Sequence, residues 1–366
     1  MAGSTFGNIF KITTWGESHG EGIGVVVDGC PSGLEISEEY IQTYLDRRKP
    51  GQSKYTTQRS EADTVKILSG VFEGRTTGTP ISMIVYNKTQ RSSDYSEIAG
   101  YYRPGHADYT FDEKYGFRDY RGGGRSSGRE TIGRVAAGAI ACKLLSELGI
   151  KVTAYARSIG DIEIDYNNFD INERDNNPVA MPDINASRRA EELLKEKMAK
   201  KDSVGGIVEC VVKNMKTGIG EPVFDKLDAC LAKAVMSIGA VKGVEIGAGF
   251  KVSEMSGSEN NDNFYTENGK VMKRTNNAGG ILGGISDGSD IVLRAAFKPT
   301  PSIFSEQETI NRNHENIKVE IKGRHDPIIV PRAVVVVEAM TALTVSDLLL
   351  VSMTSSMDRI KKLFID

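Results

Sequence analysis

The chain has 366 residues, of which 39% are hydrophobic and 26% are charged, and its formal net charge is −3. These values are typical of a soluble globular protein that buries a large core, as one large domain or two ordinary ones. A charge so close to neutral does not favour binding to nucleic acid or to a membrane surface. The cysteines Cys30, Cys142, Cys210 and Cys230 lack metal-site spacing, so we expect reduced thiols and no bound metal.

No segment predicts export or membrane insertion. The N-terminus has no basic-then-apolar signal pattern, and no apolar run approaches the roughly 18 residues of a membrane span. The longest candidate, residues 333–337, predicts one strand or a buried helical turn. We therefore expect a cytoplasmic protein.

The first 119 residues alternate between predicted strands and polar loops. His19 lies in a glycine-flanked loop between two strands, and His106 lies in a long aromatic loop, residues 101–119. Ser37 is the expected cap of a helix that ends at Arg47-Arg48-Lys49, and its basic run continues to Lys54. The expected strands are residues 6–14, 22–28, 65–72 and 80–86.

Residues 118–149 form a glycine-rich, arginine-studded loop that leads into a helix, expected over about 128–148. Ser127 and Glu130 have the spacing of a capping box. Arg121, Arg125 and Arg129 surround the positive end of this helix, which favours an anion site. An ordinary capped core helix with a solvated basic loop is the alternative interpretation.

The rest of the chain repeats this make-up. We interpret residues 151–185 as a polar surface excursion and 253–276 as a polar, flexible flap. The expected helices are 186–201, 221–238 and a long apolar helix that starts at Pro331; the expected strands are 204–213, 244–250 and 291–297.

The fold class that follows is α/β (α+β), and a sandwich of pseudo-duplicated halves in one domain would fit this pattern. The halves are about residues 1–150 and 205–366. A Rossmann fold is not expected, because the glycine pairs of residues 277–284 precede a strand, whereas the dinucleotide fingerprint precedes a helix.

Three of the four histidines, His19, His106 and His325, lie in glycine- or proline-flanked loops, as active-site residues often do. No HExxH pattern or Walker loop is present. Imidazole acid–base groups and an arginine-rich anion site remain. This set suits the elimination of phosphate, or the turnover of another polyanionic metabolite.

Four blocks of the sequence resemble the signature motifs of the chorismate synthase family. They are GESHG (16–20), RPGHAD (103–108), DYRGGGRSS (119–127) and GRHDP (323–327). The likeness covers nearly the whole chain in order. It implies a β-α-β sandwich fold and a homotetrameric lyase of the shikimate pathway. The reaction implied converts 5-enolpyruvylshikimate 3-phosphate to chorismate and phosphate, with reduced FMN and no net redox change.

The resemblance also implies roles for single residues. His106 would protonate the leaving phosphate, His19 would maintain the protonation state of the flavin, and Asp326 would help flavin N5 accept a proton. The substrate-binding residues carried over are Arg48, Lys54, Arg129 and Arg332. The flavin-binding residues carried over are Arg125, Ser126, Ser127, Gly239, Ala240, Gly283, Lys298, Pro299, Thr300, Pro301, Ser302 and Arg324.

Three positions depart from the commoner family pattern. Lys54 stands where many relatives have Arg, Gly239 where Asn is frequent, and Pro301 where Ser is frequent. Lys54 keeps the charge but loses the bidentate fork of arginine. Backbone contacts at the other two positions do not depend on the side chain.

Two other functions remain open from the sequence. One is a flavin oxidoreductase with net hydride transfer on a phosphorylated anionic metabolite, and the other is an RNA-binding protein that uses the arginine loop. No added reductase domain is apparent, so we expect the flavin to be reduced by a separate flavin reductase or by a reducing environment, with NADPH as an indirect reductant.

Overall fold

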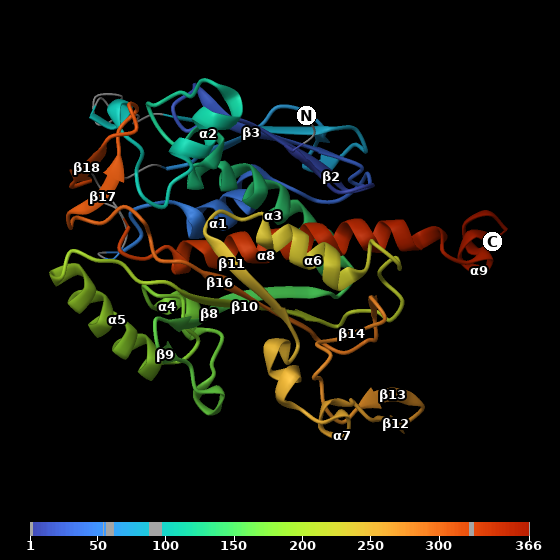
Figure 1. Cartoon of the computed structure of the whole chain (residues 1–366). Coiled ribbons are helices and arrows are strands. Elements are labelled where there is room, and N and C mark those ends of the chain that lie inside the picture. The colour runs from blue at the N-terminus through green and yellow to red at the C-terminus, as the bar shows by residue number, and fades with distance from the viewer. Residues whose placement is uncertain (1–2, 54, 56–61, 88–96, 322–325, 366) are drawn as a thin grey trace.

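The computed structural model describes residues 3–53, 55, 62–87, 97–321 and 326–365. Two five-stranded sheets enclose a layer of helices, so the chain folds as a β-α-β sandwich (Figure 1). This is the α+β sandwich that the sequence predicts. All four cysteines are free thiols.

The first half supplies one sheet and two of the central helices. Its sheet has the order β1-β2-β3-β7-β4, with every neighbouring pair antiparallel. Its elements are β1 (Thr5–Phe6), β2 (Lys11–Gly16), β3 (Gly22–Asp28), α1 (Glu38–Arg48), β4 (Val65–Ile67), β5 (Val71–Phe72), β6 (Arg75–Thr76), β7 (Ile81–Tyr86), η2 (Glu97–Gly100), α2 (Asp108–Tyr115), η3 (Gly124–Ser126), η4 (Gly128–Glu130) and α3 (Thr131–Glu147).

The second half supplies the other sheet, in the order β11-β16-β10-β8-β9. Its elements are β8 (Lys151–Ile159), β9 (Ile162–Glu163), η5 (Tyr166–Asn168), α4 (Glu173–Asn176), α5 (Ile184–Ala199), β10 (Gly206–Lys213), α6 (Leu227–Met236), β11 (Val241–Ile246), η6 (Gly249–Glu254), α7 (Gly257–Asn260), β12 (Phe264–Glu267), β13 (Lys270–Lys273), β14 (Ile281–Leu282), β15 (Ile285–Ser286), β16 (Ile291–Phe297), β17 (Gln307–Ile310), β18 (Asn316–Val319), α8 (Val330–Val351), η7 (Ser352–Thr354) and α9 (Met357–Phe364).

The two sheets have the same topology. In each, two antiparallel strands are followed by a helix, two further strands and a second helix: β2, β3, α1, β4, β7, α3 and then β8, β10, α6, β11, β16, α8. The equivalent strands also take the same places, β2-β3-β7-β4 and β8-β10-β16-β11. This is the arrangement of a pseudo-duplicated fold, and its second half begins at Lys151 instead of residue 205.

The four helices α1, α3, α6 and α8 form the core layer. Helices α3 and α8 pack together, and Gly138 allows this because a Cβ there would lie 2.3 Å from Ala339 Cβ. Within Val330–Thr354, α8 with η7, the chain is long and apolar enough to cross a membrane, contrary to the expectation from sequence. However, 83% of its most apolar window is buried, as expected for a core helix between two sheets.

The interpretation of residues 151–185 as a surface excursion is wrong for its first nine residues, which form β8. Residues of β8 pair with β10 along its whole length, and Ala154, Ala156 and Ile159 are fully buried. On the opposite face Tyr155 donates to the buried Glu209 at 2.5 Å. The polar composition of this strand therefore reflects a covered polar face of the sheet.

The expected flap, residues 253–276, contains ordered elements: η6, α7 and the β12–β13 hairpin. Its base is fixed by Lys273, which is buried between Asp262 at 3.2 Å and Asp287 at 2.7 Å. The aromatic loop likewise contains a helix, α2. The helix expected over 221–238 begins only at Leu227.

Candidate active site

The ends of four core helices meet at one end of the helical layer, on the left of Figure 1. Arg48, the last residue of α1, donates to the carbonyl of Gly128 just before α3 at 3.2 Å. Arg332, in the first turn of α8, donates through Nε to the carbonyl of Arg48 at 3.0 Å. Arg134 of α3 reaches Ser237, which follows α6, at 2.6 Å. The positive ends of the α3 and α8 dipoles therefore lie beside these arginines.

The predicted substrate-binding arginines Arg48, Arg129 and Arg332 come together at this place. Asp63 binds two of them, with Oδ2 2.5 Å from Arg48 Nη2 and Oδ1 3.2 Å from Arg129 Nη1. Arg332 contacts Asp326 at 2.5 Å. We call these five side chains the arginine cluster. It has three cations for two carboxylates, which favours an anionic ligand.

The electrostatics of the cluster agree with an excess of positive charge. Burial lowers the pKa of Arg48 to about 10; Asp63 opposes this shift, and the nearby Arg332 and Arg129 add to it. Among the described residues, Nε of Arg48 has no hydrogen-bond partner although it is buried. A buried donor without an acceptor costs about 1–3 kcal/mol, so an anion that accepts from Nε would remove that cost.

Asn87 connects the arginine cluster to the loop that carries His19. Its Oδ1 accepts from Arg129 Nε and Nη2 at 3.1 and 2.8 Å. Its Nδ2 donates to the carbonyls of Glu17 and Gly20 at 3.0 and 2.9 Å. The β2–β3 loop and the arginines are therefore held in one hydrogen-bonded unit.

His19 lies against the glycine run of residues 122–124. Its Nδ1 is 3.1 Å from Ser18 Oγ, and a Cβ added at Gly122 would lie only 2.2 Å from that nitrogen. Any side chain at position 122 would displace the imidazole. The glycine run thus serves the close approach of the loop to His19.

The predicted flavin residues of the loop before α3 are largely engaged with the protein. Arg125 donates to the carbonyls of Gly16 and Thr14 at 3.1 and 3.0 Å and to Thr14 Oγ1 at 2.6 Å. Ser126 Oγ donates to the Gly123 carbonyl. The expected capping box is wrong: Ser127 Oγ accepts from the Arg129 N–H at 3.3 Å. The Glu130 carboxylate, which should reach back, binds Thr14 and Arg134.

A second group of predicted residues gathers at His106. The Pro104 carbonyl lies 3.1 Å from Nδ1, and Ser302 Oγ lies 2.9 Å from Nε2. Because a carbonyl only accepts, Nδ1 carries the proton in the neutral ring and Nε2 accepts from Ser302. Lys298 donates to the Gly105 carbonyl at 2.7 Å. His106 and the segment 298–302 therefore form one surface.

Asp108 closes the loop that presents His106. It receives two hydrogen bonds from the Arg103 guanidinium, at 2.7 and 2.8 Å, and a third from the Arg103 backbone N–H. Burial lowers the pKa of His106 to about 4, and the Arg103 charge contributes to the same shift. The imidazole is therefore neutral near pH 7 before any anion binds.

Ala240 joins this second group, and Gly239 leaves room beside it. The Ala240 carbonyl accepts from the Lys298 N–H at 3.0 Å. A Cβ built at Gly239 meets no atom of the described chain within 4 Å. Burial lowers the pKa of the Lys298 ammonium, with Lys242 contributing. A half-buried cation beside open space, next to a histidine, fits an anionic cofactor.

Gly283 does not join the other flavin residues within this chain. The carbonyl of its neighbour Gly284 accepts from the N–H of Leu227, at the start of α6, at 2.8 Å. Gly239 and Ala240 follow the other end of α6. A helix of ten residues is about 15 Å long, so Gly283 lies roughly that far away.

Three residues of the site carry contacts that the sequence did not single out: Asp63, Asn87 and Asp108. Asp108 lies in the quoted RPGHAD block, and the other two flank the predicted strands as polar residues. Lys54, Arg324 and His325 lie outside the described residues. Within the described part of the chain, no group of three or more His, Cys, Asp or Glu side chains suits a metal ion.

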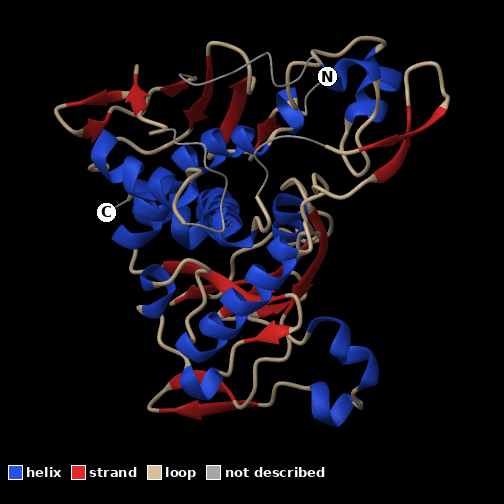
Figure 2. Ribbon diagram, turned by 90° about the vertical axis from the view of Figure 1, so that its left-hand side faces the viewer, coloured by secondary structure: helices blue, strands red, loops and turns tan. Residues whose placement is uncertain are grey.

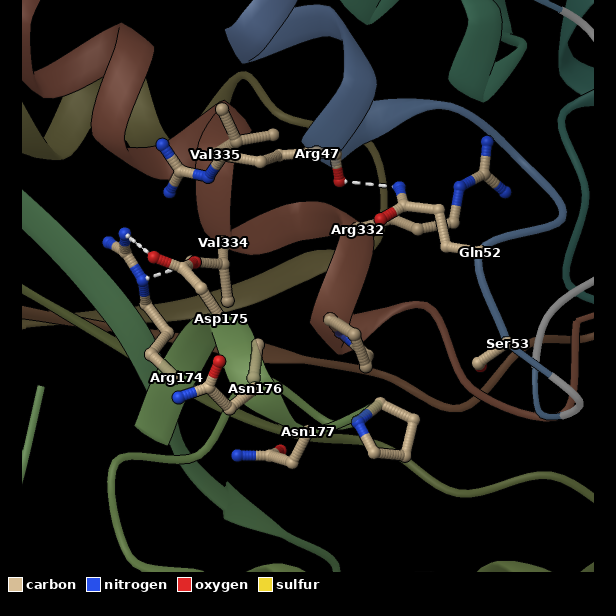
Figure 3. A pocket seen from close by; sticks show the side chains of 13 residues that line it. Arg47, Gln52, Ser53, Arg174, Asp175, Asn176, Asn177, Arg332, Val334 and Val335 are labelled. Carbon is tan, nitrogen blue, oxygen red and sulfur yellow. Dashed lines mark hydrogen bonds and ion pairs between the residues drawn. The ribbon is translucent and has the colours of Figure 1, made fainter. Parts of the chain in front are cut away.

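A cavity of about 440 Å³ lies between the ends of α1 and α8 and the α4 segment, and Arg332 of the arginine cluster lines it together with Arg47 and Arg174 (Figure 3). Its arginines are engaged: Arg174 faces Asp175, and Arg47 makes two hydrogen bonds to the buried Glu338 at 2.6 and 3.1 Å. Each cation here has its own carboxylate. The cavity therefore lacks the excess charge of the arginine cluster.

Several known proteins are similar to this chain in sequence and in fold. A family model described as chorismate synthase matches residues 10–350. The chain is 69% identical over 364 residues to a chorismate synthase of Lachnospira eligens, with 100% of both chains covered. It is 54% identical over 352 residues to one of Synechocystis sp., covering 95% of this chain and 97% of that relative. A crystal structure of chorismate synthase matches with a TM-score of 0.76 at 32% identity, over 99% of this chain and 98% of that chain. The chain therefore belongs to the chorismate synthase family.

Proposed function

We propose that the chain uses reduced FMN for the anti-1,4-elimination of phosphate from 5-enolpyruvylshikimate 3-phosphate, which gives chorismate without net redox change. As a member of its family it is a lyase of the shikimate pathway, in aromatic amino acid biosynthesis. One observation supports the proposal above all. Three arginines and the positive ends of α3 and α8 meet at one place, and the substrate carries two carboxylates and a phosphate.

Arg48, Arg129 and Arg332 would hold these anionic groups, together with Lys54. Charge-assisted bonds from guanidinium groups are strong and can be bidentate, so they fix the substrate's orientation. The Nε of Arg48, which has no partner among the described residues, is a donor available for this. Fixed cations also stabilise the charge that develops on phosphate as its C–O bond breaks.

His106 would donate a proton to the leaving phosphate. The free imidazole is neutral near pH 7, because burial holds its pKa at about 4. A phosphate dianion beside Nε2 would raise that pKa, since an opposite charge favours the protonated ring. Proton uptake would then accompany substrate binding. A positioned general acid contributes about 10²- to 10⁴-fold.

The segment 298–302, Ala240 and Gly239 would hold one side of the flavin, and the loop of Arg125, Ser126 and Ser127 the other, with Arg324. The chemistry expected of reduced FMN is electron density for an allylic system whose C–H bond no neighbouring carbonyl acidifies. His19 would maintain the flavin's protonation state, and Asp326 would assist proton transfer at N5. Gly283 is left out of the flavin site of a single chain.

Three further properties belong to the proposal. The enzyme is cytoplasmic, and it is a homotetramer. Light scattering of the purified protein measures the number of subunits. It obtains reduced flavin from a separate reductase, with NADPH as the indirect source of electrons. Addition of NADPH alone should therefore give no turnover with oxidised FMN, and a purified flavin reductase should restore it.

An anaerobic assay tests the proposed reaction. Reduced FMN and substrate should yield phosphate and chorismate in equal amounts, with catalytic use of the flavin. Consumption of one reductant per turnover would instead indicate the flavin oxidoreductase. A tight, salt-dependent affinity for oligonucleotides, with no phosphate release, would favour RNA binding. His106→Ala is the internal control, because it should abolish most turnover while FMN still binds.

A further inference from the structure

We propose that Asp63 is a positioning residue that holds Arg48 and Arg129 as one unit for the anionic groups of the substrate. The inference rests on the proposed function. It assigns the substrate site a carboxylate that itself repels the substrate, so its role must lie in what it does to the arginines.

The geometry of Asp63 points to two arginines at once. Its two oxygens lie 2.5 Å from Arg48 Nη2 and 3.2 Å from Arg129 Nη1. The Asp63 side chain is 0% exposed, Arg48 is 1% exposed and Arg129 is 11% exposed. A single buried carboxylate therefore fixes the relative position of two guanidinium groups that come from different helix ends.

Without this carboxylate the two cations would repel each other. Arg332 adds a third cation, because its Nε donates to the Arg48 carbonyl at 3.0 Å. Arg48 is also the most costly of the three to keep charged, since it is fully buried. Removal of the Asp63 charge should therefore displace Arg48 or Arg129 from its place, even if the fold survives.

The other contacts of Arg129 explain why the position matters. Nε and Nη2 of Arg129 are held by Asn87, which also binds the loop of His19. Nη1 faces Asp63. Asp63 thus ties Arg48 to an arginine whose orientation is already fixed relative to that loop. The backbone supports this placement: Asp63 has φ of 44°, a left-handed conformation that Asp tolerates better than most residues.

The test compares Asp63→Asn with wild type and with Asp28→Asn, a matched change of an exposed carboxylate at the end of β3. We expect Asp63→Asn to raise KM for 5-enolpyruvylshikimate 3-phosphate about 10- to 100-fold. In Asp63→Asn, FMN affinity and kcat should change less than about threefold. Asp28→Asn should leave KM, kcat and FMN affinity unchanged. An unchanged or lower KM would overturn the proposal, because it would mean that Asp63 is neutral or competes with the substrate for the arginines.

Asn is nearly isosteric with Asp and also tolerates the left-handed backbone, so Asp63→Glu serves as a second probe, of the position of the carboxylate. It keeps the buried charge but moves the carboxylate by one methylene, so KM should still rise. A Glu variant with wild-type KM would also refute positioning. In a double-mutant cycle, Asp63→Asn and Arg129→Lys should be strongly non-additive in KM, because both break the same unit. Additive effects would contradict the inference.

Equilibrium binding separates this inference from the proposed function. Calorimetry with 5-enolpyruvylshikimate 3-phosphate, and with inorganic phosphate as a smaller probe, needs no turnover. If wild type binds the substrate but releases no phosphate from it, the proposed function fails. Weaker binding by Asp63→Asn would then still support positioning, and equal binding would refute it.

Discussion

Arg47 and Arg48 are neighbours at the end of α1, yet they enter two different charge clusters. Arg47 points to the cavity and pairs with Glu338 through two hydrogen bonds. Arg48 points to the helix ends and shares Asp63 with Arg129. Burial opposes the charge of Arg47, but Glu338 raises its pKa above the normal value, whereas burial and two nearby arginines lower the pKa of Arg48.

The difference teaches how to tell a structural arginine from a ligand-binding one. Glu338 is itself buried and also accepts from the Ala154 N–H, and Arg47 is its main cationic partner inside the core. The cluster of Arg47 is complete without a ligand. Among the described residues, the cluster of Arg48 has more cations than carboxylates and a buried donor without a partner, which is what we expect of a site that binds an anion.

The largest expected effect is that of Arg48→Ala on turnover. We expect kcat/KM to fall about 10²- to 10³-fold, because loss of a buried, hydrogen-bonded charge at a binding site costs about 2–5 kcal/mol. Steady-state kinetics under anaerobic conditions measures it, and circular dichroism checks the fold. A variant that is folded and fully active would place the substrate elsewhere.

Arg47→Ala should show the opposite pattern. It leaves Glu338 with weaker partners, Arg174 at 3.4 Å and one backbone N–H. Breaking a buried pair costs about 3–5 kcal/mol, and Arg47 is partly exposed, so we expect about 3 kcal/mol of lost stability. Urea unfolding measures it. Activity at a permissive temperature should stay within about threefold of wild type, and a large rise in KM would remove the distinction between the two clusters.

The Arg103–Asp108 pair shows that a fully paired arginine can still serve the site, through His106. The unfolded chain takes up a proton at His106 near pH 6.5, while the folded chain does so only near pH 4. Stability should therefore fall as pH drops through this window. Between pH 7 and pH 5, the free energy of unfolding of His106→Asn should therefore fall by about 2 kcal/mol less than that of wild type. Parallel curves for the two proteins would show that burial does not depress this pKa.

How much of the fold and of the candidate site could be predicted from sequence depends on how far apart the contacting residues lie in the chain. Helix α1 begins after Ser37 and ends at Arg48 as expected, because caps and terminal charges are local signals. The contact of Asp63 with Arg129 spans 66 positions and leaves no local pattern. Such pairing is set by how distant segments of the first half pack together, which a single sequence does not reveal.

Strand β8 shows a second limit. Tyr155 of this strand is buried against Glu209, and the partly exposed Arg157 lies 4.0 Å from the same carboxylate. Composition averaged over residues 151–185 therefore indicates a surface segment, although every second residue of the strand faces the core. The structure brings His106 and the segment 298–302 together, whereas Gly283 lies near the opposite end of α6 from Gly239 and Ala240.

The smallest effect expected is that of Arg174→Leu, in α4 beside the cavity. Arg174 donates to the Ala154 carbonyl at 3.1 Å and contacts Glu338 at 3.4 Å, while its shorter contact is to the exposed Asp175. Exposed pairs contribute about 0–1 kcal/mol. We expect a loss of about 1 kcal/mol in the free energy of unfolding, with kcat and KM unchanged. If Arg174→Leu instead raised KM as Arg48→Ala does, the cavity behind Arg332 would belong to the substrate site.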